Sequence, residues 1–392
     1  MTTMDTRLTE LTARMRGFID DEVIPREPVL ARDDDTAGQA LAGLRARAKE
    51  LGIWALGHPA EVGGGGLPFL DFVYLNEIIG RSEFGQLAVG SVTMQDTIML
   101  HLHGTEEQRR HWIPGLVSGD ILPSVGLTEP EVAGSDPTLI ETRAVIDGDS
   151  WVINGHKWFT TGAEQAAFCT VFARTEPDSE PRHARISAII VPIDTPGFEI
   201  VRSIPTMGHD PSDHYEVRLT DVRVPLDSLL GERGKGFAVA QDRLGAGRIF
   251  HGMRWLGQAQ RAYELMCARA NTRFAHGSLL AEKGEIHRYI AESAAQIHAA
   301  RLMTLDAARA MDAGEDYRVR VGLVKFWGAR MLHDVVDRAI QVHGALGLTA
   351  DTPLERMYRQ ARYARVYDGP DEVHRMSTAR RLLRDPGAAP WL

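Results

Sequence analysis

Residues 144–153 are Ala-Val-Ile-Asp-Gly-Asp-Ser-Trp-Val-Ile, so an Asp147-Gly148-Asp149 turn separates two short runs of β-branched and aromatic residues. A Gly-bearing turn between such runs is typical of a β-hairpin. More strand candidates with turn signals between them follow at 167–173, 186–192, 198–203 and 215–219. Together these segments predict a small β-barrel or sandwich in the middle of the chain.

Apolar residues at helical spacing occupy both sides of this β-rich segment. Before it, they predict helices over about 5–22, 39–51, 70–79 and 94–103, and Thr105 caps a further helix. After it, long amphipathic runs cover about 237–274, 281–313 and 317–344, and a fourth helix lies near the C-terminus. The sequence therefore predicts an α+β chain with an N-terminal helical domain (1–122), a central small β-barrel (123–232) and a C-terminal four-helix bundle (233–392).

The composition excludes several classes of protein. The 392 residues carry a formal net charge of −9, and 44% of them are hydrophobic, as in ordinary globular proteins. The acidic balance argues against binding to nucleic acid or to an anionic membrane. Two distant cysteines, Cys169 and Cys267, form no disulfide framework and fit a reducing compartment. Without an apolar span or a signal-peptide core, we expect no membrane segment and a cytoplasmic location.

Neither the glycine clusters nor the histidines form a specific site by themselves. The run 231–236 lacks Walker spacing and does not follow an apolar strand, so it predicts turns rather than a nucleotide loop. His101 and His103 face different sides of a helix, and no HExxH motif occurs. We therefore expect no metal site.

Two polar motifs offer more. Residues 128–136, Thr-Glu-Pro-Glu-Val-Ala-Gly-Ser-Asp, form a turn whose hydroxyls and N–H groups can hold a pyrophosphate, although a plain connecting loop explains them too. Residues 368–375, Asp-Gly-Pro-Asp-Glu-Val-His-Arg, have the composition of a helix start, with Pro370 suited to the first helical position. Asp368 is then either a helix cap or a general base.

Both motifs belong to a series of segments that resembles the flavin-dependent acyl-CoA dehydrogenases over nearly the whole chain. The matching segments, in order, are 51–54 with 61–66, 104–108, 127–136, 153–162, 230–237, 341–344, and 355–359 with 366–369. The resemblance implies the same three-part fold, with FAD between barrel and bundle and partly between subunits. It also implies an acyl-CoA substrate, an electron-transfer flavoprotein as electron acceptor, and at least a dimer, usually a tetramer.

The resemblance assigns cofactor positions residue by residue. Those positions are Leu127, Thr128, Gly134, Ser135, Phe159, Thr161, Arg273, His276, Gln341, Tyr367 and Glu372. Thr161 would bond near the reactive N5 edge, and Arg273 and Gln341 would reach the FAD of a neighbouring subunit. The sequence departs from the usual pattern at Phe159 (usually tryptophan), His276 (usually phenylalanine) and Pro370 (often a hydroxyl residue). The loop 128–136 is also one residue longer than usual.

Asp368 matches the catalytic base, which is a glutamate in most members. One methylene less shortens its reach by about 1.5 Å. Gly247 stands where another branch carries its glutamate, just before Arg248, so Asp368 is the matched carboxylate. It would take the α-proton of an acyl-CoA while a β-hydride passes to the flavin, giving a trans-2-enoyl-CoA. Ser135, Arg248 and Asp368 would contact the substrate. A subgroup with this aspartate acts on acyl-CoAs that are long or carry extra substituents.

Two alternatives remain. A flavin oxidase of the nitroalkane-oxidising or acyl-CoA-oxidising kind keeps the fold and the cofactor, and the nitroalkane-oxidising branch also uses an aspartate base. A non-catalytic, flavin-bearing DNA-binding protein needs a basic surface, against which the charge of −9 argues.

Overall fold

The computed structural model describes residues 6–32, 34–209 and 212–388. The chain divides into two compact units. The first consists of Met1–Gly57, Gly65–Ser91 and Ala246–Leu392, and the second of His58–Gly64 and Val92–Gly245. The long helix α8 (Gly236–Thr272) begins in the second unit and continues into the first.

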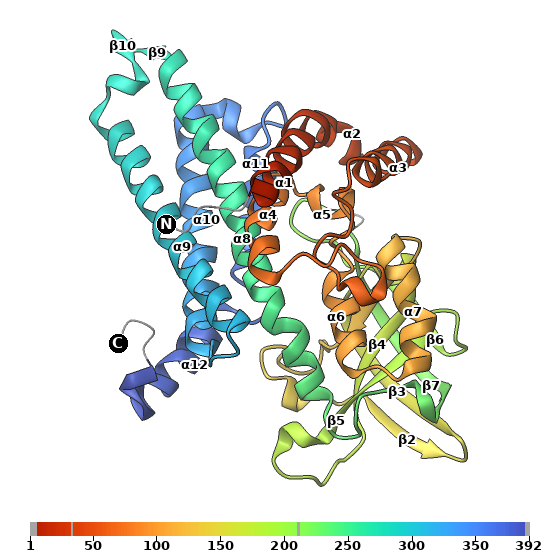
Figure 1. Ribbon diagram of the computed structural model, residues 1–392. Helices are drawn as coiled ribbons and strands as arrows, with labels where there is room; N and C mark the ends of the chain where they lie inside the picture. The colour runs from red at the N-terminus through yellow and green to blue at the C-terminus, as the bar shows by residue number, and fades with distance from the viewer. Residues whose placement is uncertain (1–5, 33, 210–211, 389–392) are drawn as a thin grey trace. The chain divides into compact units, whose positions relative to one another are not determined.

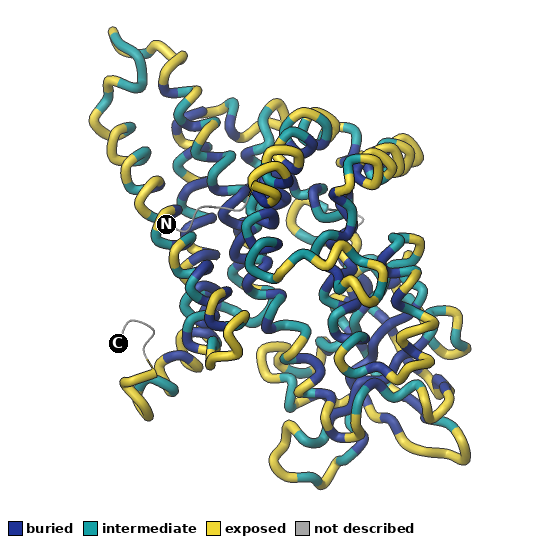
Figure 2. Tube along the Cα trace, viewed as in Figure 1, coloured by how far each residue is buried: buried dark blue, intermediate teal, exposed yellow. Residues whose placement is uncertain are grey.

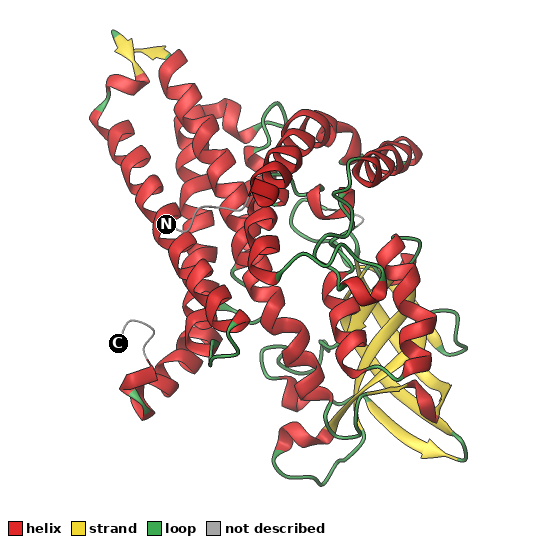
Figure 3. Cartoon of the chain, in the orientation of Figure 1, coloured by secondary structure: helices red, strands yellow, loops and turns green. Residues whose placement is uncertain are grey.

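One eight-stranded sheet forms the centre of the second unit (Figure 3). Its strands are β1 (Leu122–Gly126), β2 (Arg143–Asp147), β3 (Ser150–Thr161), β4 (Ala166–Arg174), β5 (Ile186–Pro192), β6 (Phe198–Ser203), β7 (His214–Pro225) and β8 (Leu229–Leu230). The strand order is β6-β7-β3-β2-β4-β5-β8, and β1 pairs in parallel with β4. The predicted hairpin is confirmed, because β2 and β3 pair antiparallel with Asp147 opposite Ser150 and Gly148 at φ 65°.

The inward side chains of these strands make one apolar core. It includes Ala144, Trp151, Ile153, Cys169, Val171, Ile189, Val191, Val217, Leu219 and Val222. Burial raises the pKa of the Cys169 thiol to about 12. Helix α7 (Glu106–Ser118) packs on the sheet through Trp112, whose ring centroid lies 4.5 Å from that of Phe168 in β4. It follows α6 (Met94–His103), and both helices are labelled in Figure 1. It begins with the predicted cap at Thr105.

The first unit is helical apart from a two-stranded hairpin, β9 (Phe274–Ala275) and β10 (Ser278–Leu279). Its main helices are α1 (Thr6–Gly17), α2 (Glu27–Leu30), α3 (Asp35–Glu50), α4 (Phe69–Ile79), α5 (Gly85–Ala88), α9 (Gly284–Asp312), α10 (Arg318–His343), α11 (Leu354–Ala364) and α12 (Asp371–Arg384). Helix α10 packs against α9, α11 and α12. Its buried positions recur every three or four residues and make it a central element of the bundle (Figure 2).

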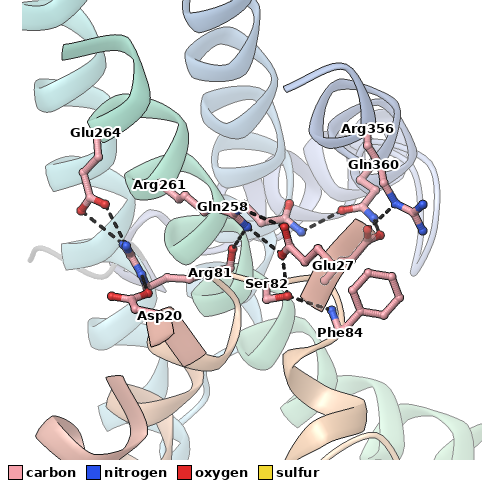
Figure 4. A network of polar contacts seen from close by, with 11 residues as sticks. Asp20, Glu27, Arg81, Ser82, Phe84, Gln258, Arg261, Glu264, Arg356 and Gln360 are labelled. Atoms are coloured by element: carbon pink, nitrogen blue, oxygen red, sulfur yellow. Dashed lines mark hydrogen bonds and ion pairs between the residues drawn. The ribbon is translucent and has the colours of Figure 1, made fainter. Parts of the chain in front are cut away.

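A polar network ties the N-terminal helices of this unit to α8 and α11 (Figure 4). Arg81 contacts Asp20 at 2.7 Å and Glu264 at 2.8 Å. Arg261 contacts Glu27 at 2.7 Å, and Glu27 also accepts a hydrogen bond from Ser82. These ion pairs join segments that lie far apart in the sequence.

The strand β1 is an element that the sequence pattern did not reveal, since it contains a proline and a glycine and little β-branched character. None of the described helices is long and apolar enough to cross a membrane.

Candidate functional site

The loop after β1 contains the first group of predicted cofactor residues, and a buried ion pair fixes its start. Lys157 of β3 donates to Glu129 at 2.8 Å and to the carbonyl oxygen of Phe172 at 2.7 Å. Glu129 also accepts hydrogen bonds from the N–H groups of Glu141 (2.6 Å) and Thr142 (3.0 Å). Burial lowers the pKa of Lys157, although Glu129 opposes that effect. Glu129 thus fixes the loop both to strand β3, through Lys157, and to the segment that leads into β2, through Glu141 and Thr142.

The loop folds back so that Gly134 lies against Thr128. The Trp158 N–H donates to the carbonyl oxygen of Thr128 at 2.8 Å. Gly134 lies so close to Thr128 that an added Cβ atom would be 2.8 Å from the Thr128 Cγ2 atom. Gly134 and Ser135 are exposed, and Leu127 and Thr128 are partly exposed. The structure therefore brings the four predicted residues of this loop together around a tight, accessible turn.

Two more predicted residues lie at the end of β3. Phe159 is 44% exposed and has a φ of 54°, which is uncommon for an aromatic residue. The Thr161 hydroxyl lies 2.8 Å from the Nδ1 atom of His214 in β7. The Phe159 ring also lies 5.4 Å from that of His214. An exposed aromatic ring in a strained conformation, beside a positioned hydroxyl, is a feature of ligand sites rather than of cores.

These six residues fit FAD on structural grounds. The glycine turn leaves no room for a side chain, so backbone N–H groups and hydroxyls can approach a pyrophosphate. Phe159 offers a planar apolar surface to an isoalloxazine ring. Thr161 offers a hydroxyl whose orientation His214 sets.

The second group of predicted residues lies in the first unit, in the turn between α11 and α12. Asp368 has a φ of 55° and Gly369 a φ of 92°, so two successive residues are left-handed. The carbonyl oxygen of Asp368 accepts from Arg248 Nε at 3.3 Å and lies 3.0 Å from His374 Nε2. Such a conformation in a non-glycine residue costs free energy and is concentrated at functional sites.

Two residues of α8, His251 and Arg248, face the Asp368 side chain, and a third, Arg254, contacts His251. His251 Nε2 lies 3.0 Å from Asp368 Oδ2, and the carboxylate is 19% exposed. Arg254 contacts the other ring nitrogen, Nδ1, at 2.7 Å. Burial tends to raise the pKa of Asp368, but His251, Arg248 and Lys325 outweigh it and hold that pKa well below its usual range. The carboxylate is therefore ionised and oriented, as a general base must be.

Two aromatic residues, Trp255 and Tyr367, and the buried Lys325 lie near Asp368. Trp255 Nε1 donates to the Tyr367 hydroxyl at 2.8 Å. Lys325 of α10 is fully buried, donates to the Ala364 carbonyl oxygen at 2.8 Å and lies 5.2 Å from the Tyr367 ring centroid. Burial lowers the pKa of Lys325 to about 8, against the opposing effect of Asp368. The structure thus brings Arg248, Tyr367 and Asp368 together, as the resemblance implies.

Among the described residues, the other four predicted cofactor residues make no recorded contact with the residues around Asp368. Glu372 lies on the exposed side of α12, 3.5 Å from Arg375. Arg273 and His276 are exposed around the hairpin β9–β10, and Gln341 is exposed near the end of α10. Their roles toward a cofactor stay predictions.

Sequence reasoning missed four residues that shape the two groups: His214, His251, Arg254 and Lys325. One signal was available, because Arg248, His251 and Arg254 recur every three residues and so share one face of α8. His214 and Lys325 carried no such signal. No group of three or more His, Cys, Asp or Glu side chains suited to a metal ion occurs within the described residues.

Comparison with known families gives a consistent result along the chain. Residues 6–120 match the N-terminal domain of acyl-CoA dehydrogenase, residues 124–222 the middle domain and residues 234–383 the C-terminal domain. The "Probable acyl-CoA dehydrogenase FadE2" of Mycobacterium tuberculosis (strain ATCC 25618 / H37Rv) is 44% identical over 358 residues, which are 89% of this chain and 87% of that protein.

Two further relatives extend the comparison. Acyl-CoA dehydrogenase family member 11 of Homo sapiens is 36% identical over 96% of this chain, which spans only 50% of that longer protein. The crystal structure of an acyl-CoA dehydrogenase from Geobacillus kaustophilus is 27% identical and has a TM-score of 0.87, covering 97% of this chain and 99% of that one. The expected fold class is thereby confirmed.

Proposed function

Because the chain belongs to the acyl-CoA dehydrogenase family and is an FAD-dependent oxidoreductase, we propose that it oxidises an acyl-CoA thioester to the trans-2-enoyl-CoA with Asp368 as the base. The observation that carries this proposal is the placement of the Asp368 carboxylate, in a left-handed turn and 3.0 Å from His251, with Arg248 and Lys325 facing it. No other carboxylate in the matched motifs, among the described residues, combines a left-handed backbone with partial burial and with two cationic groups, Arg248 and Lys325, facing it.

Asp368 removes the α-proton of the thioester. That C–H group is a very weak acid, so its removal requires stabilisation of the developing enolate oxygen by oriented donors in a water-poor site. By resemblance, the N–H group of Asp368 is one such donor, and the left-handed turn at 368–369 sets its direction. Arg248 holds the carbonyl oxygen of the same residue, so it positions the turn from which the base acts.

The loop residues Leu127, Thr128, Gly134 and Ser135 hold the pyrophosphate end of FAD, and Phe159 and Thr161 hold its ring. Bound FAD supplies the acceptor for the β-hydride. Tyr367 lies beside the base, where its hydroxyl is fixed by Trp255. Arg248 and Ser135 contact the substrate, and the aspartate base places the enzyme in the subgroup that accepts long or substituted acyl chains.

Assembly and electron transfer follow from the same family. Arg273, His276, Gln341 and Glu372 lie on exposed surface. We assign Arg273 and Gln341 to the FAD of a neighbouring subunit, which requires at least a dimer and fits a tetramer. Electrons leave to an electron-transfer flavoprotein, and the reaction is a step in fatty acid breakdown.

The decisive experiment is anaerobic mixing of the FAD-loaded protein with acyl-CoAs of different length, branching and substitution. Bleaching of the flavin by at least one thioester is expected, and Asp368→Asn should abolish it. Asp351→Asn, at an exposed position outside the site, should bleach like the wild type. Failure of every thioester to bleach the flavin overturns the proposal. Release of hydrogen peroxide in air identifies an oxidase, and bleaching by nitroalkanes alone identifies a nitroalkane oxidase.

A further inference from the structure

The three residues Arg254, His251 and Asp368 form a directional chain of contacts. Arg254 lies 2.7 Å from Nδ1 of His251. Nε2 of the same ring lies 3.0 Å from Oδ2 of Asp368, a buried oxygen that accepts no well-aligned hydrogen bond in the described structure. A guanidinium group has donors only, so the Nδ1 atom must accept. A neutral imidazole with an accepting Nδ1 carries its proton on Nε2, which faces the carboxylate.

We propose that His251 is a positioning residue for the base, locked by Arg254 in the tautomer whose Nε2–H faces Asp368 Oδ2 and supplies a donor to that buried oxygen during the reaction. This inference rests on the proposed function of Asp368. It assigns the two carboxylate oxygens different tasks: Oδ2 is held by His251, and Oδ1 takes the proton of the substrate. When the Cα–H bond breaks, an Oδ1–H bond forms and the electron pair stays on the thioester as the enolate. The His251 proton does not move.

The length of the side chain explains why such a partner is needed. Aspartate has a shorter reach than glutamate and pivots about the strained backbone at residue 368, whose φ is 55°. A donor at Oδ2 fixes the rotation of the carboxyl group, and proton transfer depends on such alignment. The Trp255 and Tyr367 rings, whose centroids lie 6.1 and 4.8 Å from that of His251, hold the imidazole in place.

Burial, together with the charge of the surroundings, keeps His251 neutral. Burial first, and then the Arg254 cation, lower the pKa of His251 to about 4, although Asp368 opposes them. The other groups that face Asp368 are Arg248 on α8, Lys325 on α10, His374 on α12 and the adjacent Tyr367. A protonated ring would carry an N–H at Nδ1 that points at the Arg254 guanidinium, and the two positive groups would repel each other. The ring therefore stays neutral, with its proton on Nε2, above about pH 4.

Two substitutions of similar shape separate positioning from simple packing. In His251→Gln the amide nitrogen takes roughly the place of Nε2 and still donates to Asp368. In His251→Asn the shorter side chain reaches only the place of Nδ1, so it keeps the Arg254 contact and loses the donor to Asp368. Both variants keep a polar side chain of moderate size, and FAD content and thermal unfolding show whether each is folded.

The rate of flavin reduction by the best acyl-CoA is measured against pH for both variants. For His251→Asn we expect a rate about 10- to 100-fold lower with little change in the apparent Kd for substrate. The pKa of Asp368 loses one stabilising partner and rises, so the acid limb of the profile moves to higher pH. His251→Gln should keep most of the wild-type rate and the wild-type limb. Equal impairment of both variants, or a wild-type profile for His251→Asn, overturns the inference.

Neutron diffraction on perdeuterated crystals tests the tautomer without any turnover. Deuterium is expected on Nε2 of His251 and not on Nδ1. Deuterium on Nδ1 refutes the inference even if the enzyme oxidises acyl-CoAs. If the wild type oxidises no acyl-CoA while Nε2 carries deuterium, the proposed function fails and the locked tautomer stands.

Discussion

The Nζ atom of Lys157 lies 2.8 Å from the Oε1 atom of Glu129, and the two side chains are only 1% and 2% exposed. Lys157 belongs to strand β3, and Glu129 lies in the loop that we assign to the FAD pyrophosphate. The pair therefore connects the stability of the sheet to the shape of the cofactor site.

Replacement of Lys157 by methionine should leave the Glu129 carboxylate buried and unpaired. We expect a loss of about 3–5 kcal/mol in the free energy of unfolding, measured by urea denaturation, together with weaker retention of FAD. The double variant Lys157→Met/Glu129→Gln should be more stable than Lys157→Met, because the uncompensated charge is gone. Equal unfolding midpoints for Lys157→Met and the wild type would contradict this prediction.

The network of Figure 4 contains ion pairs of different exposure, which should differ in energy. Arg261 and Glu27 are 11% and 15% exposed, so Arg261→Leu should cost about 3 kcal/mol by leaving Glu27 unpaired. Glu264 is 45% exposed and Arg81 keeps Asp20 as a partner, so Glu264→Gln should cost less than about 1 kcal/mol. Thermal unfolding of both variants checks the order, and similar losses would refute it.

Gly134→Ala should weaken FAD binding, because the new Cβ atom would lie 2.8 Å from the Thr128 Cγ2 atom. We expect affinity to fall about tenfold, which corresponds to about 1.4 kcal/mol, in a titration of the apoprotein followed by flavin fluorescence. Thr128→Ser removes that methyl group and keeps the hydroxyl, so the double variant should recover most of the affinity. Gly43→Ala, in the open interior of α3, should leave FAD affinity unchanged.

Acid should destabilise the protein partly through His374. Burial first, then Arg248 and Lys325, lower the pKa of His374 to about 4 in the folded chain. The unfolded chain binds this proton near pH 6.5, so stability is lost as the pH falls from about 6.5 toward 4. The unfolding free energy of His374→Gln should drop about 2 kcal/mol less than that of the wild type between pH 7 and 4.5. Parallel losses in urea titrations at these two pH values would disprove this contribution.

Much of the architecture could be predicted because local signals coincide with the final structure. The Asp147-Gly148-Asp149 turn marked the hairpin, and Thr105 marked the start of α7 with a capping box. The strand β1 could not be predicted, because it is defined by its parallel pairing with β4, more than 40 residues later in the chain. Long-range pairing of this kind leaves little trace in a local pattern.

The candidate site was predictable only where a motif carries its chemistry within a few residues. Asp368 and the loop 127–136 belong to such motifs. Lys325 looks like one charged residue on an amphipathic helix, yet it is fully buried and faces the base. His251 became meaningful only when folding placed Arg254 on one side of its ring and Asp368 on the other.

The burial of Cys169 leaves Cys267 as the cysteine that a labelling reagent can reach. Its thiol lies inside the sheet and keeps its proton at neutral pH, since burial raises its pKa to about 12. Cys267 on α8 is the other cysteine of the chain and is partly accessible. A maleimide dye should therefore attach at one defined place on the protein, on helix α8, without any engineered residue.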